Sequence, residues 1–235
     1  MIHQAISWQT VAPRIKDLRE TVYLLNRNKL TKAAILIIYA LIFIAIFSPW
    51  LAPHPTHIML DTNPQDKLLP PSTEYWFGTD ELGRDIFSRV LYGTRISLQT
   101  GLLAVGISLL IGIPLGAIAG ASEWYVDESI MRITDIFLSF PGLLMAIAIA
   151  AILGPSLQNA IFAISISWWP WYTRIVRGQA ISLKERQFVK AAQAIGTPHY
   201  KIIVRHIIPN CVAPVIVQAS MDIGGVILTI AALSF

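Results

Sequence analysis

Long runs without a charged residue constrain this chain more than any other feature of its sequence. Four such runs are present, at residues 33–51, 96–121, 136–173 and 207–235, the last broken only by Asp222. The third run has 38 residues, and as one helix it would be about 57 Å long at roughly 1.5 Å per residue. Because a bilayer core is only about 30 Å thick, we expect two membrane spans there. Gly154-Pro155-Ser156 near its middle predicts the turn between them.

The sequence therefore predicts an all-α polytopic membrane protein with five spans. Lys and Arg indicate its orientation: six precede residue 33, one lies in 122–135 and seven lie in 174–206, whereas the 52–95 loop holds four together with six acids. Since cytoplasmic segments are richer in Lys and Arg, we place the N-terminus and 174–206 in the cytoplasm and the 52–95 loop outside. The polar leader of about thirty residues is too long for a signal-peptide n-region, so we expect the first span to be retained.

Composition excludes several other classes of protein. Only 14% of the residues are charged, against roughly a quarter in a soluble domain. The positive residues behind the net charge of +4 are concentrated in the segments that we place in the cytoplasm. Their distribution is explained by membrane orientation and does not indicate a nucleic-acid partner. Cys211 is the single cysteine, and His54 and His57 have no third ligand near them in the sequence, so we predict neither a disulfide nor a metal site.

A polar segment at residues 182–209 carries the main functional signal. Ser182 and Glu185 have the spacing of a capping box, which predicts a helix start at Leu183. Gly196 supplies a helix stop and Pro198 prevents continuation, so we expect a helix over 183–195.

The apolar residues of this predicted helix recur at three- and four-residue spacings, as on one side of a helix. They are Phe188, Ala191, Ala192 and Ile195, and Lys184, Arg186 and Lys190 occupy the rest. Such a basic amphipathic helix can lie on lipid headgroups or dock onto a partner protein, and the physical pattern alone does not choose between them.

Motif spacing favours the partner protein. The chain reads Lys190-Ala191-Ala192, three residues, Gly196, nine residues, then His206-Ile207-Ile208-Pro209. This resembles the cytoplasmic loop motif of ABC-importer permeases, which is E-A-A, three residues, Gly, nine residues and I-x-L-P. Lys190 replaces the motif glutamate, His206 its first Ile and Ile208 its Leu.

Further stretches resemble the dipeptide/oligopeptide/nickel permease family, C-type subunit. They are GTDELGRDIFSR at 78–89 with Gly93 and RISL at 95–98, WYTRIVR at 171–177, and RHIIPN at 205–210. The resemblance implies a type I ABC-importer transmembrane domain with six spans, so we expect the chain to be truncated after its fifth. Residues 83–95 have an amphipathic helical pattern, which we place on the outer membrane surface as a docking region for a binding protein.

The resemblance also implies the partners: a second permease subunit, two ATP-binding subunits and an extracytoplasmic substrate-binding protein. The predicted helix at 183–195 would be the coupling helix that contacts an ATPase. The implied contact residues are Phe188, Lys190, Ala191, Ala192, Gly196, His206 and Pro209. The sequence has no Gly-Lys dipeptide and hence no GxxxxGK[ST] phosphate loop. We therefore assign ATP and Mg²⁺ to the partner subunits, and no cofactor or catalytic residue to this chain.

Small residues and one acid stand out within the spans. Gly112, Gly116 and Gly120 recur every four residues, which predicts close helix packing. Asp222 lies within the last run, where an acid is costly and faces protein or water. It is a candidate for the translocation pathway, and the alternative is a hydrogen bond between helices.

These observations predict a tail at 1–31, a first helix and external loop at 32–93, and a permease core at 94–235. We expect a multi-pass permease subunit of a bacterial or archaeal cytoplasmic membrane that imports peptides and is not itself an enzyme. A nickel or other small-solute importer is the alternative within the class. A secondary transporter is the alternative from another class, although the sequence shows no internal repeat.

Overall fold

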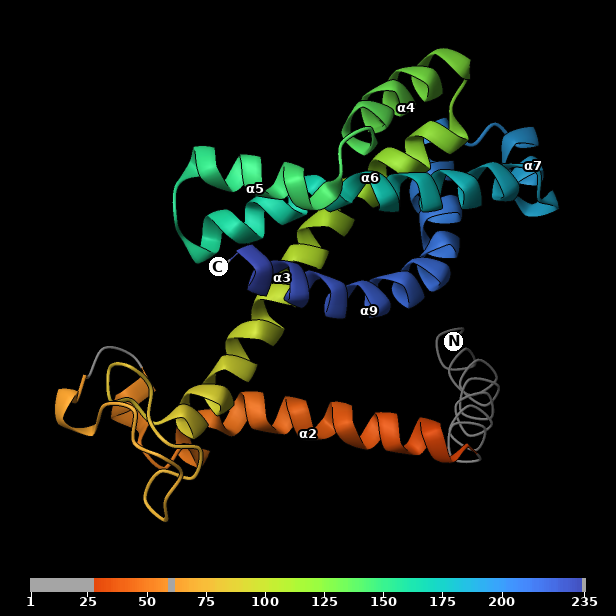
Figure 1. The fold of residues 1–235 in the computed structure, drawn as a ribbon. Helices are drawn as coiled ribbons and strands as arrows, with labels where there is room; N and C mark the ends of the chain where they lie inside the picture. Colours follow the sequence, from red (N-terminus) through yellow and green to blue (C-terminus); the bar gives the residue numbers. More distant parts are fainter. Residues whose placement is uncertain (1–27, 59–61, 234–235) are drawn as a thin grey trace, which may run out of the picture. The chain divides into compact units, whose positions relative to one another are not determined.

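The computed structural model describes residues 28–58 and 62–233 (Figure 1). Of the predicted tail at residues 1–31, residues 1–27 lie outside the described residues. The described residues confirm the all-α prediction, because their only β pairing is one isolated bridge between Thr79 and Asp85. They fall into two compact units, residues 1–96 and 97–235, which are described separately below.

The first unit contains helix α2 and the loop that follows it. Its elements are α2 (Lys29–Leu51), the short 3-10 helices η1 (Pro55–Ile58) and η2 (Pro64–Asp66), and the first turns of α3 (Ile86–Ala121). Helix α2 begins where Asn28 Oδ1 accepts a hydrogen bond from the Leu30 N–H at 2.9 Å. Most of its large apolar side chains are exposed, as expected of a helix surrounded by lipid.

Helix α3 starts ten residues before the uncharged run that it contains. Asp85 caps it, since Asp85 Oδ2 accepts from the Ser88 N–H at 3.0 Å and from Ser88 Oγ at 2.6 Å. Residues 86–95 are therefore its first turns, so the helical pattern at 83–95 is confirmed from Ile86 onward, and its place on the outer membrane surface stays a prediction. No proline separates these turns from residue 96, and the helix continues for 36 residues.

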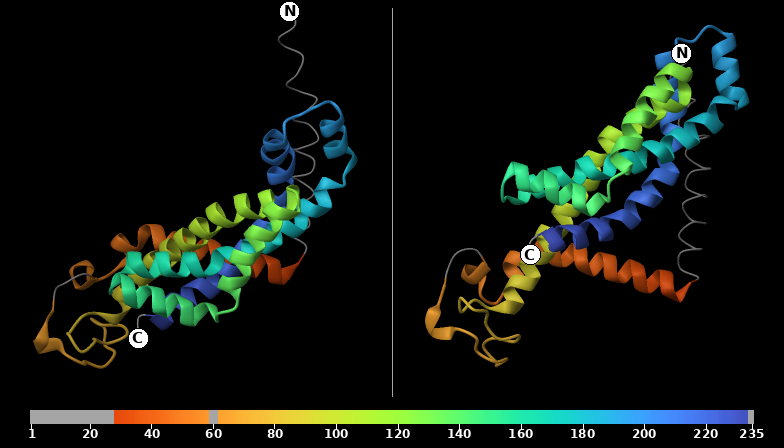
Figure 2. Two further views of the ribbon diagram at one scale, coloured as in Figure 1. Left: turned by 90° about the horizontal axis from the view of Figure 1, so that it is seen from above. Right: turned by 45° about the horizontal axis from the view of Figure 1, so that its top comes forward.

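The second unit contains the rest of α3 and the helices that follow it. They are α4 (Trp124–Leu138), α5 (Gly142–Leu153), α6 (Leu157–Lys184), α7 (Gln187–Ala194), α8 (His199–Ile202), the π-helix η3 (Ile203–Ile207) and α9 (Ile208–Leu233). Helices α4, α5 and α9 all pack on α6, and both views in Figure 2 place α5 alongside its first half. Polar residues of α6 such as Ser165 and Thr173 are fully buried among these neighbours.

The long uncharged run at 136–173 contains the predicted turn but also an unpredicted corner. Gly154 has a φ of +89°, and Ser156 Oγ caps α6 by accepting from the Asn159 N–H at 3.1 Å, which confirms the turn. The first half of the run is not one straight span, because α4 ends at Leu138 and meets α5 at 85°. Pro141 accounts for the break, since it lacks an N–H and disfavours helix at the residue before it.

The number of helices that could cross a membrane therefore differs from the five predicted. By length and composition, three qualify among the described residues: α2, α3 and the continuous stretch His199–Leu233. The bent pair α4–α5 would make a fourth. Helix α5 alone has 12 residues and is only about 18 Å long, which is shorter than a bilayer core. Helix α6, with 28 residues, is long enough to cross a membrane, but its polar residues make it too polar to qualify by composition.

Candidate functional site

The helix predicted at 183–195 is shorter than expected, and the capping-box prediction is wrong. Helix α6 runs through Ser182 and ends at Lys184, and α7 occupies Gln187–Ala194. Ser182 lies inside α6, two residues before its end, so it does not start a new helix. Only Glu185 and Arg186 separate the two helices. The two helices are thus joined by a two-residue connection.

The predicted stop at Gly196 is confirmed. Gly196 has a φ of +79°, a backbone conformation in which a residue with a Cβ is strained. Its N–H donates to Gln193 O at 2.9 Å, and the Thr197 N–H donates to Ala192 O at 3.0 Å. These are the two hydrogen bonds of a Schellman motif, which satisfy the last carbonyls of α7.

The apolar residues of α7 lie along one side of the helix, as predicted, but one edge of that side is buried and the other is exposed. Val189 and Ala192 point into the protein and are 0% and 6% exposed. Phe188, Ala191 and Ile195 point outward, with Phe188 43% and Ile195 82% exposed. Ala192 therefore holds α7 on its own subunit, and the other three residues form the surface that a partner can reach. We call Phe188, Ala191 and Ile195 the outer face of α7.

The end of the predicted motif lies beside α7 but does not terminate a helix. The π-helix η3 leads directly into α9, so Pro209 lies in the first turn of α9. A proline ring crowds the carbonyl four residues earlier, and widening the turn to a π-helix relieves this clash. Asn210 Nδ2 donates to the His206 carbonyl at 2.7 Å. The His206 ring lies 6.3 Å from the Phe188 ring, centroid to centroid.

Lys190, which replaces the motif glutamate, forms an ion pair within the same segment. Its Nζ lies 2.7 Å from Glu185 Oε2, and both side chains are largely exposed. The hydrogen bond from Lys190 and its positive charge lower the pKa of the Glu185 carboxyl. The segment therefore presents a neighbouring positive and negative charge beside the outer face of α7.

Gly112, Gly116 and Gly120 form a stripe of α3 against which α6 packs. A Cβ on Gly116 would lie 2.5 Å from Thr173 O, and one on Gly120 would lie 2.6 Å from Arg177 O. One on Gly112 would lie 2.7 Å from the Tyr172 Cβ. No side chain fits in these gaps, so the two backbones touch as the four-residue spacing predicts.

Two serines extend the same contact with hydrogen bonds between α3 and α6. Ser108 Oγ lies 3.1 Å from Ser165 O and 2.9 Å from Ala104 O, and Ser165 Oγ lies 3.2 Å from Ala104 O and 2.7 Å from Ile161 O. Each hydroxyl therefore shares its proton between an acceptor in its own helix and one in the other helix. Both side chains are fully buried. The sequence contains the signal, because Ala104 and Ser108 continue the four-residue spacing of the glycines toward the N-terminus.

Asp222 forms a hydrogen bond between helices. Its Oδ2 accepts from the Tyr172 hydroxyl of α6 at 2.8 Å, and its Oδ1 accepts from Gln218 Nε2 at 2.9 Å. Tyr172 itself is fully buried. Both carboxylate oxygens thus have protein donors, which is the arrangement expected of a structural acid within the membrane. A role for Asp222 in the translocation pathway stays a prediction.

Two ion pairs that the sequence analysis did not anticipate join α4 to α6. Arg177 binds Asp127 through two parallel contacts, Nε to Oδ1 at 2.5 Å and Nη2 to Oδ2 at 2.7 Å. Arg174 Nη2 lies 2.6 Å from Asp135 Oδ1. The partners are about 40 to 50 residues apart in the sequence, so only the fold reveals them.

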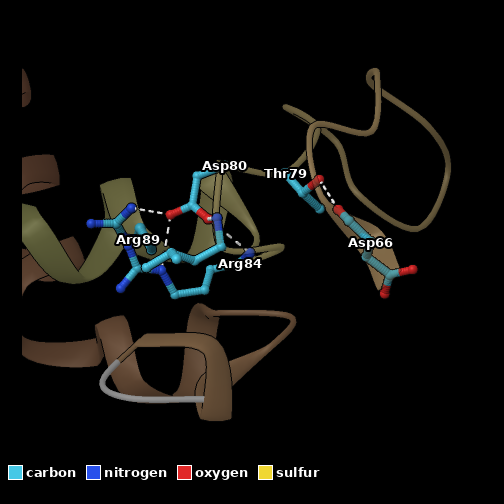
Figure 3. A network of polar contacts seen from close by, with 6 residues as sticks. Asp66, Thr79, Asp80, Arg84 and Arg89 are labelled. Carbon is cyan, nitrogen blue, oxygen red and sulfur yellow. Dashed lines mark hydrogen bonds and ion pairs between the residues drawn. The ribbon is translucent and has the colours of Figure 1, made fainter. Parts of the chain in front are cut away.

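In the first unit, a loop and the first turn of α3, which we together call the 62–89 loop, are held by a network of hydrogen bonds around Asp80 (Figure 3). Asp80 accepts from the N–H groups of Leu82 and Arg84 at 2.8 and 3.0 Å and binds the side chains of Arg84 and Arg89. Burial opposes ionisation of Asp80, but these contacts outweigh it and lower its pKa from 3.8 to about 2. Thr79 Oγ1 donates to the carbonyl of Asp66.

Three aromatic side chains lie close together in this segment. The centroid of the Phe87 ring lies 4.9 Å from that of the Trp76 ring and 5.1 Å from that of the Phe77 ring. Trp76 and Phe77 are 58% and 54% exposed. Gly83 fixes the turn beneath them, because it has a φ of +75° and a Cβ there would collide with the Asn63 carbonyl. The loop is thus preorganised, and its apolar side chains point outward.

Comparisons with known proteins agree with this architecture. A family model described as "Binding-protein-dependent transport system inner membrane component" matches residues 112–235. A second, described as "N-terminal TM domain of oligopeptide transport permease C", matches residues 18–71.

Curated relatives cover most of the chain. The dipeptide transport system permease protein DppC of Alkalihalophilus pseudofirmus is 50% identical over 217 residues, which are 92% of this chain and 70% of the relative. The probable D,D-dipeptide transport system permease protein DdpC of Escherichia coli is 46% identical, over 91% of this chain and 71% of the relative. The glutathione transport system permease protein GsiD of Pectobacterium atrosepticum is 41% identical, over 89% and 69%. The chain therefore belongs to the binding-protein-dependent transport permeases, as a C-type permease subunit of the dipeptide and oligopeptide ABC importers.

Proposed function

We propose that this subunit imports peptides across the cytoplasmic membrane, driven by ATP that two partner subunits bind with Mg²⁺ and hydrolyse. A second permease subunit completes the pathway, and an extracytoplasmic binding protein delivers the substrate. Relatives at 41–50% identity are described as dipeptide, D,D-dipeptide and glutathione permeases, which supports a small peptide as the substrate class. Nickel, the alternative considered from the sequence, has no such support among these relatives.

The outer face of α7 is the observation that carries this proposal. Phe188 and Ile195 are large apolar side chains that the described residues leave uncovered. The adjoining part of the same apolar side, with Val189 and Ala192, is already packed on its own subunit. A helix that is anchored along one edge of its apolar side and exposed along the other is suited to seating in a groove of a second protein. We assign that groove to an ATP-binding subunit.

Lys190 and Glu185 give this contact its charges. In the family motif a glutamate stands where this chain has Lys190, and here Glu185 supplies a carboxylate that Lys190 contacts at 2.7 Å. We propose that the ATP-binding subunit places an acidic residue near Lys190 and a basic residue near Glu185. Exchanging the two residues, as Glu185→Lys with Lys190→Glu, would weaken association with the native partner and leave the fold intact.

The orientation proposed from the Lys and Arg distribution places α7 in the cytoplasm and the 62–89 loop outside. Cysteine labelling tests it, because native Cys211 is buried. In intact cells a membrane-impermeant thiol reagent should label Leu82→Cys, at a position that is 45% exposed. It should label Ala194→Cys, also at an exposed position, only after permeabilisation. The opposite labelling pattern would show that α7 faces outward and the 62–89 loop faces the cytoplasm, which contradicts the proposed orientation.

We assign the aromatic group of the 62–89 loop to the binding protein. Phe87 precedes the uncharged run of α3 by nine residues, about 13 Å at roughly 1.5 Å per residue. The headgroup layer adds only about 5–8 Å to each side of the hydrocarbon core. Trp76, Phe77 and Phe87 therefore lie beyond the lipid, where exposed aromatic side chains favour contact with a protein.

Reconstituted uptake tests the proposed function. Proteoliposomes that contain both permease subunits and the ATP-binding subunits should accumulate a labelled dipeptide only with binding protein and ATP. Nickel should neither accumulate nor compete. Uptake that needs an ion gradient but no ATP would instead favour the secondary transporter.

A further inference from the structure

We propose that the Asp127–Arg177 ion pair makes α4 move together with α6 and α7, so that displacement of α7 reaches the bend between α4 and α5. This inference rests on the proposed function, because it assumes that an ATP-binding subunit moves α7. Asp127 and Arg177 act here as positioning residues, since neither is assigned to touch substrate or nucleotide.

The two ion pairs that join α4 to α6 differ in geometry and exposure, and Asp127–Arg177 is the stronger of the two. Its two parallel contacts at 2.5 and 2.7 Å hold the guanidinium in a fixed orientation. Its side chains are only 33% and 20% exposed, for Arg177 and Asp127 respectively. The Arg174–Asp135 pair has a single contact, and its side chains are 47% and 54% exposed. Exposed pairs of this kind contribute little.

Arg177 also lies at the point where α6 touches α3. Its carbonyl would lie 2.6 Å from a Cβ on Gly120, and its N–H nitrogen would lie 3.1 Å from one on Gly116. The backbone of Arg177 is therefore fixed on α3 while its side chain holds α4. Lys184 Nζ adds a hydrogen bond to the Ser122 carbonyl, just before α4, at 3.3 Å.

The far end of α4 leads to the bend. Phe137 packs edge-on against Trp169 of α6, with ring centroids 5.2 Å apart, one residue before α4 ends. The chain then turns by 85° into α5. Since α7 follows α6 after two residues, a continuous set of contacts links the outer face of α7 to this bend.

Uptake per ATP in the reconstituted complex tests the proposal, because a purely structural pair would change uptake and hydrolysis together. In Asp127→Asn we expect ATP hydrolysis close to that of the wild type and uptake per ATP lowered by about 3- to 30-fold. The charge-swapped double variant Asp127→Arg/Arg177→Asp should recover most of the loss. Arg132→Gln is the matched control, since it removes the exposed Glu128–Arg132 pair within α4 and should change neither quantity.

Unchanged uptake per ATP in Asp127→Asn would overturn the proposal. If that variant does not assemble, the double variant decides: recovered uptake per ATP supports the proposal, and an assembled complex that has lost it contradicts the proposal. Failure of the proposed function looks different, because the wild-type complex would then take up no peptide with ATP.

A distance measurement tests the same inference without transport. Spin labels at the exposed positions Tyr125 and Gln193, in a Cys211→Ala background, report on α4 and α7. With the ATP-binding subunits present, the wild type should keep one mean distance with and without ATP, whereas Asp127→Asn should show a change. A wild-type distance that changes on ATP binding would show that α4 does not follow α7.

Discussion

Gly116→Ala should separate α3 from α6, because the added methyl group meets atoms that cannot move aside. Its Cβ would lie 2.5 Å from Thr173 O and 2.7 Å from the Val176 Cβ. Ordinary contact begins at 3.4 Å, so the helices must move apart by 3.4 minus 2.5, or about 0.9 Å. The interhelical contacts from Ser108 Oγ to Ser165 O at 3.1 Å and from Ser165 Oγ to Ala104 O at 3.2 Å would then stretch beyond hydrogen-bonding range.

The expected cost follows from these two losses. Overpacking costs about 1–3 kcal/mol, and two interhelical hydrogen bonds add about 0.6 kcal/mol each, giving roughly 2–4 kcal/mol in total. For a chain of this length that lowers the thermal midpoint by about 4–16 °C. Thermal unfolding of the purified protein in detergent, followed by circular dichroism, measures the shift.

Gly106→Ala is the matched control on the same helix. A Cβ at Gly106 would have no atom within 4 Å, so alanine there should be neutral or stabilise the helix by up to about 1 kcal/mol. Equal midpoints for the two variants would refute the close-packing argument. A lower midpoint for Gly106→Ala than for Gly116→Ala would refute it more strongly.

Two further predictions concern single acids. Tyr172→Phe removes the hydroxyl that donates to Asp222 at 2.8 Å and should destabilise the protein by about 0.6–1.7 kcal/mol in the same unfolding assay. Asp222→Asn, which keeps an acceptor for that hydroxyl, should leave uptake unchanged, and a large loss of uptake would place Asp222 in the pathway. Asp80 has its pKa lowered from 3.8 to about 2, so the stabilisation that it gives the 62–89 loop is complete above about pH 4 and is lost as the pH falls toward 2. Fluorescence of Trp76 should change over that range in the wild type but not in Asp80→Asn, and a pH dependence that persists in Asp80→Asn would contradict the assignment.

Local chemistry allowed part of this structure to be predicted from the sequence. The stop at Gly196 and the turn at Gly154 depend on backbone conformations that glycine alone adopts readily, so the residue type reveals them. The stripe of Gly112, Gly116 and Gly120 is visible because one face of a helix repeats every three to four residues. Asp222 could be recognised as an acid with protein partners, since an isolated charge in an uncharged run needs one.

The remaining features depend on tertiary contacts. Ser182 and Glu185 fit a capping box, but α6 continues through Ser182 to Lys184, and Glu185 lies at its C-terminal end. Ala192 shares its side of the helix with the exposed apolar residues, and only the packing of α7 on α6 and α8 shows that it is buried. The bend between α4 and α5 had a signal in Pro141, which the uncharged character of the run obscured. The Asp127–Arg177 pair joins residues 50 positions apart, and no local pattern encodes that contact.

Association with the ATP-binding subunit tests the central claim most directly. Ala191→Glu places a charge on the outer face of α7, whereas Gln193→Glu places the same charge on an exposed position on the other side of the helix. A charge buried in an apolar contact costs about 2 kcal/mol or more, which is about thirtyfold in affinity. We predict that Ala191→Glu loses the ATP-binding subunit on co-purification while Gln193→Glu retains it. Retention of the subunit by both variants would contradict the assignment of α7 as the coupling helix.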